Sequence, residues 1–216
     1  RGVDLIECWY SNCQRFFHCR YRFRYVLFVA LILFGCSFEQ DEKINYEAEF
    51  YSIVSEFEKS SILNFDRKDI DKEIFIEQFI LKLDKQKNTF LLEDFNTFRE
   101  TANNQTKSNY QQLKDVVDLY YLRYEEALKT RRQYLNNFEF NYNKIEKINL
   151  KPRDSFFQNK EEKQDYQRRI VKNELINLLL EDKNNFEAKS ELKKTYTNRL
   201  SSVSKIRESD RFGILA

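Results

Sequence analysis

The side chains best suited to metal or thiol chemistry in this sequence are its cysteines, all of which lie within the first 36 residues. Cys8, Cys13 and Cys19, with His18 beside them, are residue types that bind zinc. Their Cys-x4-Cys-x5-Cys spacing differs from that of common zinc sites, where paired ligands stand roughly two to four residues apart. We therefore predict no metal and no cofactor. Because no cysteine follows Cys36, the remaining chain offers neither a disulfide nor a thiol nucleophile.

Cys36 has a different setting, because it follows an export-like segment. Residues 20–24 are rich in Arg, residues 25–35 are apolar, and these are the parts of a secretory signal. The apolar run is about half of the roughly 20 residues that span a membrane. Leu33-Phe34-Gly35-Cys36 resembles the bacterial lipobox, with Leu33 and Gly35 as cleavage positions and Cys36 as the lipid attachment site. Phe34 is bulkier than usual, and the alternative is a buried apolar helix ending in Gly-Cys.

This reading divides the chain into three parts. Residues 1–35 are the predicted upstream segment and signal peptide, residues 36–46 the lipid attachment site and polar tether, and residues 47–216 the folded domain. Two or three acyl chains anchor a protein stably, since each buried CH₂ contributes about 0.8 kcal/mol. We expect a periplasmic location in the bacterial cell envelope, with lipid anchoring to a membrane. The chain contains no Met, even at position 1, which suggests an incomplete or misplaced start.

Ser190 and Lys194 are the pair closest to a serine nucleophile with a basic partner. They stand four residues apart, on one face of a predicted helix. Ser-Lys catalysis also needs an amine of depressed pKa and backbone N–H groups shaped as an oxyanion hole. Gly usually allows that close backbone approach, and after Gly35 only Gly213 remains. We expect the pair to be solvated surface and predict no catalytic residue in this chain.

The composition favours an all-α fold. Hydrophobic residues make up 41% and charged residues 33%, enough for a core beneath a charged surface. Three Gly and one Pro are too few for the corners of a sheet or barrel. We predict a bundle of about five to six helices of unequal length, with residues 140–158, which include Pro152, as an irregular crossing. The amphipathic segments at 3.6-residue spacing are 44–57, 69–83, 89–99, 108–138, 166–180 and 184–209.

The charge pattern argues against nucleic-acid binding. The chain carries 37 basic and 35 acidic residues, and five of the Arg precede Cys36 against two acids, so the remainder is close to neutral. Acidic and basic residues also interleave, whereas a nucleic-acid binder shows a basic stripe. Aromatic residues, at 16%, fall at helical spacing, which is typical of a core rather than of a stacking platform.

Several short segments occur in a recognisable order. The first is Leu83-Asp84, separated by five residues from Phe90. It is followed by Glu93-Asp94-Phe95, Tyr120-Tyr121-Leu122-Arg123-Tyr124, Phe138-Glu139-Phe140, Arg168 to Leu175, and Tyr196 to Arg199. In this order they resemble the N-terminal region of the tail-specific (carboxyl-terminal processing) proteases. The resemblance covers about 69–212. The Trp-Pro usual near the crossing is absent, and Lys151-Pro152 is its nearest substitute.

The resemblance implies a function. In that family the helical region precedes a PDZ domain and a protease domain whose nucleophilic Ser is activated by a Lys. Full-length members of the family are therefore serine endopeptidases. Neither domain is in this sequence, and we interpret Ser209 to Phe212 as the entry to the next domain. We therefore expect this chain to be the non-catalytic helical N-terminal domain of a periplasmic, lipid-anchored protease that degrades or processes proteins from apolar C-termini. The chain would be truncated before the PDZ and protease domains. The expected partners are the missing domains, the membrane and protein substrates; the alternative is a free-standing envelope lipoprotein acting as a binding scaffold.

Overall fold

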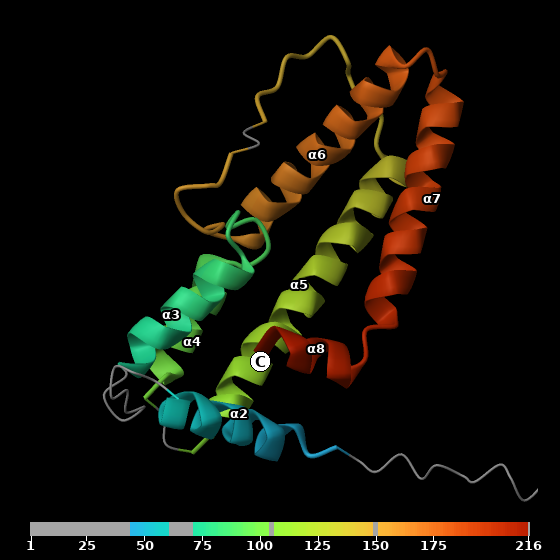
Figure 1. Cartoon of the computed structure of the whole chain (residues 1–216). Helices are drawn as coiled ribbons and strands as arrows, with labels where there is room; N and C mark the ends of the chain where they lie inside the picture. The colour runs from blue at the N-terminus through green and yellow to red at the C-terminus, as the bar shows by residue number, and fades with distance from the viewer. Residues whose placement is uncertain (1–43, 61–70, 104–105, 149–150, 216) are drawn as a thin grey trace, which may run out of the picture. The chain divides into compact units, whose positions relative to one another are not determined.

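The computed structural model describes residues 44–60, 71–103, 106–148 and 151–215. Over these ranges the chain forms helices and no strand, as Figure 1 shows. The all-α prediction is confirmed, with slightly more helices than expected. The helices are α2 (Tyr46–Ser60), α3 (Lys72–Leu83), α4 (Leu92–Thr101), α5 (Asn109–Asn137), α6 (Lys160–Leu180), α7 (Asn185–Ser204) and α8 (Glu208–Leu215).

Helix α5 is the central element of the unit formed by residues 46–216. It contacts α6 and α7, which also pack on each other, and at its other end it contacts α2, α3 and α8. Helix α3 packs against α4. Figure 1 shows α5 running between α6 and α7, with α8 crossing it near the N-terminal half. The predicted irregular crossing is the long connection from α5 back to the start of α6.

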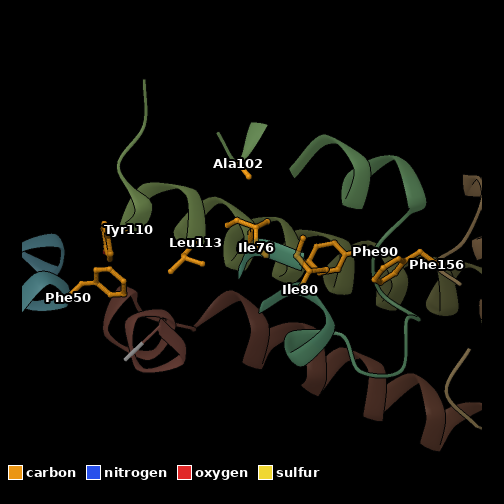
Figure 2. Packing of buried hydrophobic residues seen from close by; sticks show 9 residues of the cluster. Phe50, Ile76, Ile80, Phe90, Ala102, Tyr110, Leu113 and Phe156 are labelled. Atoms are coloured by element: carbon orange, nitrogen blue, oxygen red, sulfur yellow. The ribbon is translucent and has the colours of Figure 1, made fainter. Parts of the chain in front are cut away.

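Two hydrophobic clusters lie along α5. The first joins α2, α3 and α5 with Phe90 and with Phe156 of the crossing, whose rings meet edge to face at 6.4 Å between centroids (Figure 2). Its buried members are Phe50, Ile76, Ile80, Phe90, Ala102, Tyr110, Leu113, Val116 and Phe156. The second joins α5, α6 and α7, and its buried members are Leu128, Leu135, Phe140, Val171, Leu175, Ala188, Leu192, Tyr196 and Val203. Many of the aromatic residues are therefore core, as predicted, whereas Phe57, Phe75, Phe138, Tyr142 and Phe186 are exposed.

Polar side chains set the helix boundaries where Gly and Pro are scarce. Ser108, Asn159 and Asn184 each accept a backbone N–H from the first turn of α5, α6 and α7. Two turns place non-Gly residues in the left-handed region, Lys87 with φ 52° and Asp182 with φ 63°. Such a conformation costs about 1 kcal/mol or more without Gly. Side-chain caps and the left-handed residues Lys87 and Asp182 thus take the place of Gly and Pro at these connections.

Two predicted helices differ from the structure. Helix α6 begins at Lys160 rather than at residue 166, because Asn159 caps a first turn that is polar and shows no apolar stripe. The predicted segment 184–209 is interrupted between α7 and α8. There the Asp210 carboxylate accepts the backbone N–H of Arg207 at 3.0 Å, which starts a new helix. Neither boundary carries a Gly or Pro signal.

Candidate functional site

The predicted lipid attachment site Cys36 and the cleavage positions Leu33 and Gly35 lie outside the described residues, as do the upstream cysteines and His18. Ser190 and Lys194 lie on the exposed surface of α7, and no hydrogen bond joins them. Within the described residues, no helix is both long enough and apolar enough to cross a membrane. The same residues contain no group of His, Cys, Asp and Glu side chains that could hold a metal ion.

The loop between α3 and α4 is organised by one buried carboxylate. Asp84 is 3% exposed and accepts backbone N–H groups from Asn88 at 3.1 Å, Thr89 at 2.9 Å and Phe90 at 3.0 Å. These bonds fold the loop back over the end of α3 and direct Phe90, which is fully buried, into the first cluster. The Leu-Asp-x5-Phe segment is therefore a self-capped turn that delivers a core aromatic residue.

A second carboxylate joins that loop to α5. Asp94 is 7% exposed, accepts the N–H of Leu91 at 2.9 Å, and so caps α4. It also receives two bonds from the Arg123 guanidinium, at 2.9 Å from Nε and 2.8 Å from Nη2. Arg123 further contacts Glu126 at 2.9 Å. A bidentate pair of this kind is geometrically specific, so it fixes α4 against α5.

The crossing docks on the same loop. The N–H of Leu92 donates to the Phe157 carbonyl at 2.8 Å, and Lys87 Nζ donates to the Asp154 carbonyl at 2.7 Å. The Arg153 guanidinium lies 4.0 Å from the centroid of the Phe157 ring. Segments about seventy residues apart in sequence are therefore held side by side, and Phe157 is fully buried between them.

Lys163, on the first turns of α6, completes this junction. Its side chain is 7% exposed, and Nζ donates to the carbonyl oxygens of Thr89 and Arg123. Burial, with a smaller effect of the nearby Arg123 guanidinium, lowers the pKa of Lys163 to about 8, against the raising effect of Glu126, Asp94 and Asp84. The ammonium thus binds α6 to the α3–α4 loop and to α5 at once.

A second polar cluster holds the other end of the crossing against α6. Glu146 receives bonds from Arg168 at 2.6 and 3.1 Å and from Lys172 at 2.8 Å. These hydrogen bonds lower the pKa of Glu146 to about 2.

A separate polar contact joins α6 and α7. The Tyr196 hydroxyl donates to Glu174, and burial is the main cause that raises the pKa of that tyrosine.

A groove of about 290 Å³ opens beside the junction, between α5 and α6. Leu91 and Ala127 give it an apolar part, and the rest of its lining is polar. The polar lining comes from Arg123, Glu126, Lys129, Thr130 and Gln133 of α5 and from Lys160, Lys163, Gln164 and Gln167 of α6. Gln167 is 1% exposed, and its carbonyl oxygen accepts from Arg131 Nε at 2.6 Å.

Chemically, the junction is a structural one. The carboxylate oxygens of Asp84 and Asp94 accept hydrogen bonds from within the domain, so neither carboxylate is available as a general base. Sequence reasoning missed the role of Lys163. The available signal was the 3–4 spacing of Lys160, Lys163, Gln164 and Gln167, which places these polar residues on one helical face.

A comparison with known protein families identifies the domain. The sequence model described as the tail specific protease N-terminal domain matches residues 53–216. No curated protein matches the chain. The family match covers most of the sequence and includes the α3–α4 loop, the Asp94–Arg123 pair and the crossing. The chain therefore belongs to the tail-specific protease family and carries that family's N-terminal domain over residues 53–216.

Proposed function

We propose that this chain is the non-catalytic helical N-terminal domain of a tail-specific serine protease that degrades or processes proteins from their apolar C-termini. The observation that carries the proposal is the family match over residues 53–216. It is supported by the chemistry of the junction, where the charged groups are engaged in holding helices together. A domain built in this way acts as a frame for the parts that bind and cleave substrate.

The rigid parts of that frame are the two hydrophobic clusters and the polar junction near the middle of α5. Arg123 lies between the α5 residues of the first cluster, which end at Tyr120, and those of the second, which begin at Tyr124. Helix α5 continues through both clusters. Its 29 residues, roughly 45 Å long, therefore fix the position of one cluster relative to the other. By this proposal the domain shapes or gates the cradle in which the protease domain receives its substrate.

The proposal includes lipid anchoring through Cys36 on the periplasmic side of a bacterial membrane. Support comes from the sequence: an Arg-rich stretch, a short apolar run and Leu33-Phe34-Gly35-Cys36. When the chain is expressed in a bacterium, labelled palmitate should be incorporated, and Cys36→Ala should abolish both label and membrane attachment. Equal labelling of the Cys36→Ala protein would remove anchoring from the proposal and leave the domain assignment untouched.

The assignment itself is tested by reading the gene beyond the codon for Ala216. A downstream frame encoding a PDZ pattern, then a Ser nucleophile segment followed by a Lys, is the expected result. An immediate stop codon with no such frame nearby would contradict it and would favour the free-standing binding scaffold.

A further inference from the structure

We propose that the groove between α5 and α6 binds an oxyanion, the carboxylate or phosphate group of a small ligand, with Lys163 and Gln167 as its buried donors. The inference goes beyond the proposed function and does not depend on it. It starts from the hydrogen-bond capacity of two side chains that line the groove and that the junction only partly uses.

The first of these is the Lys163 ammonium, which carries three N–H donors. Two of them are directed to the carbonyls of Thr89 and Arg123. No carboxylate among the described residues forms an ion pair with this ammonium, although the side chain is 93% removed from solvent. A buried charge is costly unless an opposite charge accompanies it. Glu126, Asp94 and Asp84 act on this ammonium only through space, without an ion pair. An anion in the groove would therefore be its first direct anionic partner and could accept the remaining N–H.

The second is the Gln167 carboxamide, one helical turn further along α6 on the same face. Its oxygen is occupied by Arg131 Nε, which leaves the NH₂ group as the free half of the amide. That NH₂ makes no hydrogen bond within the described part of the chain, and Gln167 lines the groove. Lys163 and Gln167 thus present donors, and an oxyanion has the acceptors to satisfy both.

The charge balance of the lining points the same way. Its one carboxylate, Glu126, is paired with Arg123, and Lys129 is paired with Glu125 at 2.7 Å outside the groove. Lys160, at the start of α6, forms no ion pair among the described residues and adds a positive charge to the groove. A volume of about 290 Å³ lies near the lower end of the roughly 300–1,000 Å³ of small-molecule sites, so one anionic group with a short substituent fits.

The test is protection of Lys163 from amine modification. The full 216-residue chain, in detergent, is reductively methylated near pH 8 with sodium phosphate, with sodium succinate, or with sodium chloride at matched ionic strength. Modification is then read for each lysine by mass spectrometry. Exposed Lys193 on α7 is the internal control. When the concentration of an anion is about ten times its Kd, the methylation of Lys163 should fall about tenfold, while the methylation of Lys193 should not change. Protection by phosphate alone assigns a phosphate ligand, and protection by succinate alone assigns a carboxylate.

Gln167→Glu is the matched variant, because it keeps the acceptor for Arg131 and replaces the NH₂ donor with a repelling oxygen. It should lose the protection of Lys163. Lys160→Gln should weaken the protection of Lys163 severalfold. Because it changes only a surface residue, it keeps the test usable if Gln167→Glu does not fold. Lys193→Gln should leave the protection of Lys163 unchanged. Absence of protection by either anion in the wild-type chain, or full protection in folded Gln167→Glu, would overturn the proposal.

Discussion

Asp84→Ala should be one of the most damaging single truncations in the domain, although it removes only a carboxylate. The change leaves three backbone N–H groups without their acceptor, of which those of Thr89 and Phe90 are buried. Each buried donor that loses its partner costs about 1–3 kcal/mol. The two together predict a loss of about 2–6 kcal/mol in the free energy of unfolding. That is a large share of the roughly 5–15 kcal/mol of a typical domain.

The assay is urea unfolding of a 37–216 fragment, followed by the helical circular dichroism signal. The midpoint should fall while the slope of free energy against urea stays constant, because the surface exposed on unfolding is unchanged. The matched control is Asp154→Ala in the crossing. Asp154 is exposed and uses only its backbone carbonyl, as the acceptor for Lys87, so its truncation should change stability by no more than about 0.5 kcal/mol. If Asp84→Ala were as mild as Asp154→Ala, the assignment of Asp84 as the organiser of the loop would be refuted.

Three further outcomes are expected. Arg123→Ala should destabilise by about 3–5 kcal/mol in the same urea assay, because it leaves Asp94 charged and buried; a loss below 1 kcal/mol would speak against the pair. Since the folded pKa of Glu146 lies below its unfolded value, the stability it contributes is present above about pH 4.5 and is lost as the pH falls toward 2. Glu146→Gln should therefore flatten the acid limb of the stability profile, and an unchanged limb would show that Arg168 does not hold this carboxylate. Membrane fractionation should find the Cys36→Ala protein in the soluble fraction, whereas retention in the membrane would argue against lipid anchoring.

Sequence periodicity predicted the long helices well. The apolar stripe placed a helix at 108–138, and α5 runs from Asn109 to Asn137. Its ends could be predicted because Ser108 is a local cap and because apolar residues recur at three- and four-residue steps along most of its length. The start of α6 was missed because its first turns are polar and show no apolar stripe. These turns pack against the rest of the domain through the buried side chain of Lys163 instead.

The polar junction could not be predicted from spacing. Asp94 and Arg123 stand 29 residues apart, and Lys163 meets the Thr89 carbonyl across 74 residues. Such pairings arise from the packing of helices and leave no periodic trace. The resemblance marked Asp84 and Phe90 as positions of a family turn, but the physical reason, a carboxylate accepting three backbone N–H groups, is visible only once the loop is folded.

The most direct test of the central claim is cleavage of an unstructured protein with an apolar C-terminus. The repurified 37–216 fragment alone should give no turnover, and adding back PDZ and protease domains of a tail-specific protease should give cleavage. That activity should vanish on changing the Ser or Lys of the added domains and should survive changes at Ser190 or Lys194. Turnover by the fragment alone that depends on Ser190 or Lys194 would contradict a non-catalytic domain and would make this chain an enzyme.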